Sequence, residues 1–276
     1  RMVLAQQLQP LNRDYLPNLQ NVWPSLQDPF YDQGSQYTVP YTIYTTGIGY
    51  RTDKVAKAPE AYANPYDIFF DGANKGKTWL LDDGREAPSA MLLRNGITDL
   101  NTEKPEDIAL AKKELLAMID AVNVKVSTED YTKLPEGSAH VHQAWSGSMV
   151  AAPYYLPKGT GAEVLGYWFP EDGAGPIGSD MMGVLEGAKN PVLAHLLIDH
   201  LLSEDAGLSN FAFVGYQPPL TALDPQRLVD EEYIPANLTS AIVRESDFDN
   251  GFQELELSPA GQKLWQNAWA EFKAGI

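Results

Sequence analysis

Two carboxylates stand at the end of an apolar run in the segment KTWLLDDGRE, residues 77–86. Asp83 and Glu86 could clamp an ammonium group together, or they could act as the acid and base of a hydrolase. In open α/β sheets, ligands bind beyond the carboxyl ends of strands, where a strand over this run would place both acids. Acids are also favoured at helix starts by the helix dipole, and the local sequence favours this structural interpretation slightly.

Other residues that commonly carry catalysis show no such arrangement. The four histidines have no third ligand at metal-like spacing, and we interpret all of them as structural: His140, His142, His195 and His200. The chain has no cysteine, which excludes thiolate nucleophiles and Cys-based metal sites. The GIG run at 47–49 lacks a following helix signal, and no phosphate loop, nucleophile elbow or HExxH motif is present. The sequence therefore predicts a protein without catalytic activity, metal or cofactor.

Aromatic residues next to Gly or Pro are candidates to contact a ligand. Most of the aromatic side chains are expected to fill the core, but Trp145, Trp168 and Tyr216 lie in loop-like contexts. An aromatic ring at such a junction can stack on an alkyl chain or face a cation.

Charge and composition restrict the class of partner. The net charge is −17 and the pI about 4.5, which argues against nucleic acid, because binding to phosphates needs clustered Lys and Arg. An acidic surface favours solubility and weakly favours cationic ligands. With 276 residues, 44% of them hydrophobic, the chain can form one large or two medium domains. No apolar run approaches the ~18 residues that span a bilayer, and any export signal is expected upstream of Arg1.

The elements that must position these residues alternate between strand and helix. Residues 37–55 are rich in β-branched and aromatic side chains and predict a strand, whereas residues 1–36 predict loops with short helical turns. A helix is expected from Pro105 to about Val122, because proline and two acids open it and apolar residues recur at helical spacing. Further helices are expected after the Asn-Pro at 190–191 and the Ser-Pro at 258–259. This alternation predicts an α/β fold with covered sheets.

Several segments occur in the order and spacing of a known family: YTVPYTIYTTGIGYRTDKV, WLLDDGRE, HQAWSGSMVAAPYYLPKG, AKNPVLAHLLIDHLLSEDAG, VGYQPP and EFKAG. Over essentially the whole chain they resemble the spermidine/putrescine-binding proteins of bacterial ABC importers, which have the two-lobed type 2 periplasmic-binding-protein fold. The resemblance implies a periplasmic or extracellular receptor, free or anchored as a lipoprotein. Such a receptor captures a polyamine and delivers it to a membrane permease.

The resemblance also implies a ligand-binding set of acids, aromatic residues and one amide: Asp83, Glu86, Trp145, Asp180, Tyr216 and Gln253. Asp83 and Glu86 would hold one end of the polyamine, and Asp180 would pair with another amine. Trp145 would stack on the methylene chain. Carboxylates and an aromatic wall are what an alkyl diammonium requires.

Two departures from the family pattern have structural consequences. The family carries a tryptophan where this chain has Gly178, so the pocket is expected to be wider or differently shaped. Arg1 aligns inside the family's first lobe, so a segment of that lobe is expected to be missing, with a separate chain as one candidate source. Strands near 37–47 and 179–185 should then pair with a second polypeptide or leave a gap in their sheet.

The expected lobes are discontinuous in sequence: 1–48 with 180–224 for a partial lobe one, and 52–176 with 228–276 for lobe two. The crossovers between them are expected near 48–52, 176–180 and 224–228. Two other functions stay open, a receptor for another small organic cation or amino-acid-like solute, and a carboxylate-based hydrolase that uses Asp83 and Glu86.

Overall fold

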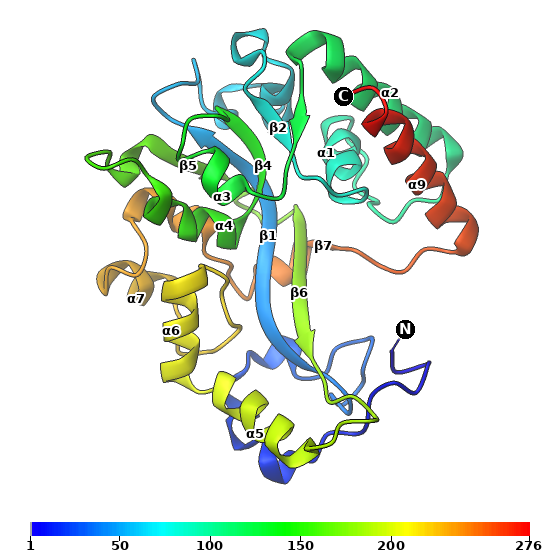
Figure 1. Ribbon diagram of the computed structural model, residues 1–276, viewed down its shortest axis with the longest axis vertical. Coiled ribbons are helices and arrows are strands. Elements are labelled where there is room, and N and C mark those ends of the chain that lie inside the picture. Colours follow the sequence, from blue (N-terminus) through cyan, green and yellow to red (C-terminus); the bar gives the residue numbers. More distant parts are fainter. Residues whose placement is uncertain (1) are drawn as a thin grey trace.

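One long strand organises the molecule. The computed structural model describes residues 2–276, and its first strand, β1, Val39–Arg51, runs vertically through the centre of the molecule (Figure 1). The sequence of β1, VPYTIYTTGIGYR, is rich in β-branched and aromatic residues, which suit a pleated and largely buried strand. The strand expected over 37–55 is therefore confirmed.

A mixed sheet forms around β1, with the order β3-β2-β4-β1-β6-β7 and β5 also paired with β1. The other strands are β2 Thr78–Leu80, β3 Lys125–Val126, β4 Val141–Trp145, β5 Leu165–Trp168, β6 Pro176–Met182 and β7 Phe252–Gln253. The C-terminal half of β1 pairs with β4 and β5, and its N-terminal half pairs with β6, all antiparallel. Parallel pairing adds β2 and β3 beyond β4, and β7 beside β6.

The helices gather above and below the middle of β1 (Figure 1). They are α1 Glu86–Arg94, α2 Pro105–Val122, α3 Asp130–Lys133, α4 Ser146–Ala151, α5 Pro191–Leu201, α6 Glu204–Val214, α7 Pro225–Asp230, α8 Asp247–Asn250 and α9 Pro259–Lys273. The bounds of α2 match the expected helix. Helix α9 begins as expected after Ser258, whose side chain accepts a hydrogen bond from the backbone of Gly261.

Two buried clusters hold these elements together. In the upper half, Ile48 and Leu80 of the sheet pack with Met91 of α1, Leu115 of α2 and Trp265 of α9. This cluster fixes the start of α1, where Glu86 lies.

The second cluster continues from the upper half into the lower half. It joins Ile43 of β1 with Met149 of α4, Phe211 of α6 and Leu238 in the 3-10 helix η9, Ala236–Ala241. Elements from both halves therefore share buried contacts around the middle of β1.

In the lower half the sheet is narrow. The N-terminal part of β1 and β6 form a ribbon that β7 joins only at the start of β6, at Pro176 and Ile177. Beyond β7, the described residues add only isolated bridges: Leu8 with Leu185, Val22 with Leu220, and Ile43 with Gln217. These strands correspond to the ones near 37–47 and 179–185 for which open pairing was expected. Helix α5 in this half exposes three leucines: Leu193, Leu196 and Leu197.

Candidate functional site

Alternate residues of β1 present polar and aromatic groups on one face of the central ribbon. Thr42 and Tyr44 pair in register with Asp180 and Gly178 of β6, so these side chains share a face. The Thr42 hydroxyl donates a 2.9 Å hydrogen bond to Oδ2 of Asp180. This bond fixes the carboxylate at the point where β1 and β6 pass between the two halves of the molecule.

Glu86, the first residue of α1, reaches the same region from above. Its Oε1 atom accepts hydrogen bonds from the Thr46 hydroxyl at 2.9 Å and from the Trp145 indole N–H at 3.0 Å. Burial raises the pKa of Glu86 to about 7, with the nearby Glu254 carboxylate as the next largest cause. Glu86 is thus an acid whose charge lacks a compensating cation.

Glu86 borders a cavity of about 290 Å³, called here the Glu86 cavity. Four aromatic rings line it: Phe30, Tyr31, Tyr44 and Phe252. Gln253 and Glu254, from β7 and the residue after it, lie on the same wall. Burial also raises the pKa of Glu254. Two carboxylates and several aromatic faces therefore surround a single small space.

A second space of about 400 Å³, the Asp180 cavity, adjoins the first at Tyr44, which lines both. Its lining residues are Tyr41, Thr42, Tyr44, Trp145, Asp180, Val214 and Tyr216. Burial raises the pKa of Tyr216 to about 12, so its hydroxyl stays protonated at neutral pH. The two cavities are also linked by the hydrogen bond between Trp145 and Glu86.

The structure brings five of the six expected site residues to these two adjoining cavities. Glu86 and Gln253 line the first, and Trp145, Asp180 and Tyr216 line the second. Asp83 lines neither; it borders a separate groove with Arg85, Trp265 and Trp269.

Asp83 holds the start of α1. Its Oδ1 atom accepts hydrogen bonds from the backbone N–H groups of Arg85 at 2.7 Å and Glu86 at 2.9 Å. This is the helix-start role that the local sequence favoured for the acids. Asp83 therefore orients Glu86 through the backbone.

We expect Asp83→Ala to lower the free energy of unfolding by about 1 kcal/mol, the usual cost of losing a helix-start acceptor. Ligand affinity should stay within about threefold of the parent protein, because Glu86 keeps its own partners. Urea unfolding and ligand titration of the same preparation measure both. Asp82→Ala is the control, since Asp82 makes an exposed ion pair with Lys273 and should change either quantity little. A loss of affinity as large as that of a Glu86 variant would place Asp83 in the site.

Sequence reasoning missed several residues of this region, among them Tyr44 and Glu254. The alternation of polar residues along β1 was a usable signal for Tyr44, since Thr42 and Thr46 flank it on one face. No local signal marks Glu254, because only the pairing of β7 with β6 brings it beside the cavity of Glu86.

Gly178, where a wider or differently shaped pocket was expected, lies under the ring of Tyr44. A Cβ atom on Gly178 would lie 2.5 Å from Cζ of Tyr44, so the tyrosine ring already covers the glycine. An aromatic ring from the neighbouring strand therefore covers this position, and the shape of the pocket here is set by Tyr44.

Gly178→Ala should displace the Tyr44 ring and weaken cation binding about three- to tenfold, the loss expected for one aromatic–cation contact. Gly187→Ala is a matched control, because a Cβ there meets no atom within 4 Å. Titration of both variants with the same ligand tests this expectation. Unchanged affinity in Gly178→Ala would show that Tyr44 is not part of the site.

The histidines lie outside both cavities. His142 is buried and stacks on Trp79, with ring centroids 6.0 Å apart, and burial lowers the pKa of His142 to about 4. His195 accepts a hydrogen bond from the backbone N–H of Asn12.

Within residues 2–276, no group of three or more His, Cys, Asp or Glu side chains is arranged to hold a metal ion. Over the same residues, no helix combines the length and the apolar character that crossing a bilayer requires.

Comparisons with known proteins all find bacterial solute-binding proteins. A protein family described as "Bacterial extracellular solute-binding protein" matches residues 1–235. The putrescine/agmatine-binding protein of Pseudomonas aeruginosa is 29% identical over 224 residues, which are 78% of this chain and 60% of that protein. The spermidine/putrescine-binding periplasmic protein of Escherichia coli K12 is 26% identical over 268 residues, which are 97% of this chain and 72% of that protein.

Solved structures show the same fold. A spermidine/putrescine ABC transporter substrate-binding protein from Streptococcus pneumoniae superposes with a TM-score of 0.77 at 22% identity, covering 99% of this chain and 80% of that one. A putative spermidine/putrescine ABC transporter protein from Listeria monocytogenes gives a TM-score of 0.78 at 24% identity, with the same coverage. These likenesses confirm the expected two-lobed α/β fold.

Proposed function

Because the chain belongs to the bacterial extracellular solute-binding protein family, we propose that it is the receptor of an ABC importer for a small cationic solute. The solute is a polyamine such as putrescine or spermidine, bound between the two lobes and delivered to a membrane permease. Curated relatives whose names include putrescine or spermidine support this ligand class. A receptor of this kind acts in the periplasm or outside the cell.

The observation that carries the proposal is a set of three acids that form no ion pair and stand beside aromatic side chains. Among residues 2–276, no Lys, Arg or His forms an ion pair with Glu86, Asp180 or Glu254. Glu86 is half-buried, whereas Asp180 and Glu254 are exposed. A half-buried carboxylate such as Glu86 without a counter-charge is unfavourable, and an ammonium ligand would supply that charge together with hydrogen-bond donors. Tyr44 and Trp145 stand where a methylene chain between two ammonium groups would lie.

We assign the roles accordingly. Glu86 binds one ammonium group, Asp180 binds the other, and the Gln253 side chain accepts or donates a further hydrogen bond. Tyr44 and Trp145 contact the alkyl chain, and Tyr216 borders it from the side of α6. Asp83, expected to bind the ligand directly, acts instead by holding the backbone at Glu86.

We propose that the lobes divide as the sequence suggested, with crossovers near 48–52, 176–180 and 224–228. Closure about these crossovers would bring Glu86 of α1 and Tyr216 of the lower half around the ligand. The pairing of β1 supports a crossover along this strand, because β1 pairs with β6 up to Thr45 and with β4 and β5 from Thr46 onward.

A receptor for another organic cation is the second candidate. Four aromatic rings border the Glu86 cavity, and aromatic cages hold alkylated ammonium groups such as that of choline. Two acids in one cavity favour an ammonium with N–H donors over a quaternary one, since only the former can donate hydrogen bonds.

A carboxylate-based hydrolase is the least supported of the three candidate functions. The family consists of solute-binding transport proteins. In addition, Oδ1 of Asp83, one of the two acids in that hypothesis, is already engaged by two backbone N–H groups.

Calorimetric titration of the chain with putrescine, spermidine, choline, glutamate and butane-1,4-diol tests the proposal. We expect saturable one-to-one binding of putrescine or spermidine and none of the diol, which has a similar shape without charge. Tightest binding of choline would support the second candidate. Binding of glutamate without binding of any amine would contradict both.

A further inference from the structure

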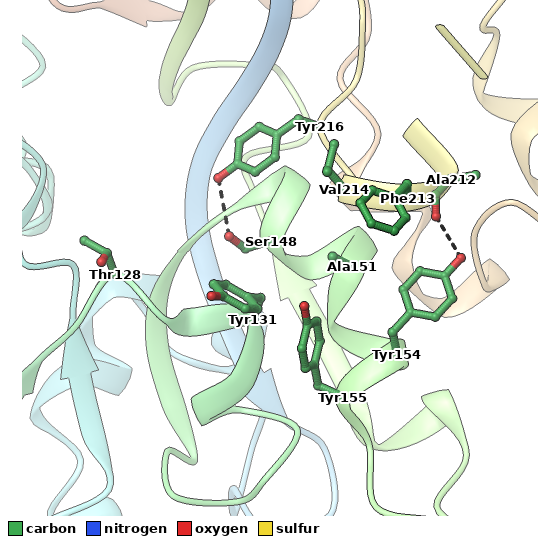
Figure 2. A pocket seen from close by; sticks show the side chains of 10 residues that line it. All are labelled: Thr128, Tyr131, Ser148, Ala151, Tyr154, Tyr155, Ala212, Phe213, Val214 and Tyr216. Atoms are coloured by element: carbon green, nitrogen blue, oxygen red, sulfur yellow. Dashed lines mark hydrogen bonds between the residues drawn. The ribbon is translucent and has the colours of Figure 1, made fainter. Parts of the chain in front are cut away.

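A third cavity, called here the tyrosine cavity, lies beside Tyr216 and has a volume of about 760 Å³. Figure 2 shows the side chains that line it: Thr128, Tyr131, Ser148, Ala151, Tyr154, Tyr155, Ala212, Phe213, Val214 and Tyr216. Tyr131 comes from α3, and Tyr155 from η7, Ala152–Tyr155. Phe213 and Val214 form the end of α6. The cavity thus lies between elements of the upper and the lower halves.

Hydrogen bonds connect the two sides of the tyrosine cavity (Figure 2). The Tyr154 hydroxyl donates to the carbonyl oxygen of Ala212 at 2.8 Å. The hydroxyl oxygens of Ser148 and Tyr216 lie 3.4 Å apart. These contacts hold the end of α6 beside η7, and the space between them stays open.

The chemistry of this cavity differs from that of its neighbours. None of the ten described residues that line it is charged, whereas the other two cavities contain Glu86, Glu254 and Asp180. Phe213 is 82% exposed and Tyr155 47% exposed. Tyr131 and Tyr155 meet edge to face, with ring centroids 5.1 Å apart. Exposed apolar surface of this kind, gathered in a hollow, marks a binding surface.

The tyrosine cavity adjoins the Asp180 cavity, because Tyr216 and Val214 line both. Carboxylates therefore line the two neighbouring cavities, and neutral aromatic side chains line this one. A molecule bound through an amine at Asp180 could extend past the ring of Tyr216 without leaving the protein surface.

We propose that the tyrosine cavity is a subsite for the neutral, apolar end of an amine ligand whose charged end is held at Asp180 and Glu86. The inference rests on the proposed function for the charged end and adds a second ligand class, amines that carry an aromatic or alkyl substituent. Burial of the substituent against Phe213 and Tyr155 supplies the additional affinity.

The test compares putrescine with N-benzylputrescine, the same diamine with a benzyl group on one nitrogen, by calorimetric titration of the full chain. We expect the benzyl group to tighten binding about tenfold and to make the heat-capacity change of binding more negative. In the double variant Tyr155→Ser with Phe213→Ser, this advantage should fall below about twofold, while putrescine affinity stays unchanged. Both side chains are exposed enough for the fold to tolerate their loss.

Leu193→Ser is the matched control, since Leu193 is an exposed apolar residue on α5, outside the cavity. It should leave the benzyl advantage intact. If putrescine binds but the benzyl group adds nothing, or if its advantage survives in the double variant, the subsite is wrong and the proposed function stands. If neither amine binds, both are wrong.

Discussion

Glu86→Gln is expected to weaken putrescine binding by about 10- to 100-fold. A hydrogen bond to a charged partner contributes about 1.5–3 kcal/mol, and each 1.4 kcal/mol corresponds to a factor of ten. Glutamine keeps an oxygen that can accept the hydrogen bonds from Thr46 and Trp145, so the loss reports the charge and not the local structure. Calorimetric titration at pH 8, where Glu86 is ionised, measures the effect.

Stability gives an independent check on this variant. Because the folded pKa of Glu86 is about 7, raised mainly by burial, ionised Glu86 opposes folding at higher pH. Glu86→Gln should therefore unfold no more easily than the parent protein at pH 8. Asp82→Asn also replaces a carboxylate by an amide, at an exposed neighbouring position, and serves as the control for putrescine affinity. Equal putrescine affinity in the parent protein and Glu86→Gln would remove Glu86 from the site.

Putrescine affinity is expected to fall by up to about 100-fold as the pH drops from 7.5 to 5, and to be nearly constant above pH 8. The ligand binds the ionised form of Glu86, whose pKa in the free protein is raised to about 7 mainly by burial. Below that pH, binding must displace a proton, and affinity decreases toward about tenfold per pH unit. Alkyl amines stay charged over this whole range, so the ligand itself contributes no titration.

Titration in two buffers of different ionisation enthalpy measures the proton released on binding. We expect the protein to release a proton on binding putrescine near pH 6, and to release little at pH 8. The carboxylates of Glu254 and Asp83 also act on Glu86, so the decisive comparison is the Glu86→Gln variant, in which the profile should flatten. A profile that keeps its slope in this variant would assign the titration to another acid, such as Asp130, whose pKa burial also raises to about 7.

The free energy of unfolding of the ligand-free protein has the opposite pH dependence to putrescine affinity. The folded pKa of Glu86 lies above its unfolded value, so its contribution to stability is fully present below about pH 4.5 and is lost as the pH rises through 7.

The fold was predictable wherever local signals agreed. Pro105 with its following acids and Ser258 with its proline mark two helix starts, and the structure begins α2 and α9 there. Helix α6 was not predicted, although Ser203 caps it, because its end exposes Phe213 and Val214 and its apolar residues form no single buried stripe. Exposed leucines on α5 show the same limit, since periodicity cannot tell a core face from an exposed one.

The arrangement of the site residues depends on tertiary contacts more than the helix starts do, so it was harder to predict from the sequence. The family resemblance named Glu86 and Asp180 as ligand-binding residues. It gave Asp83 and Glu86 the same role, whereas in the structure Asp83 accepts hydrogen bonds from the backbone at the start of α1. Tyr44 covers Gly178 only because β1 and β6 pair in that register, and register cannot be read from one strand alone. Local sequence could therefore give residue types but not their neighbours.

A crystal structure of the chain with putrescine tests the central claim most directly. We expect one ammonium nitrogen within about 2.7–3.1 Å of a Glu86 carboxylate oxygen, with the other nitrogen at Asp180 and the methylene chain against Tyr44 and Trp145. Density for the diamine elsewhere on the protein, with both carboxylates free of it, would contradict the account.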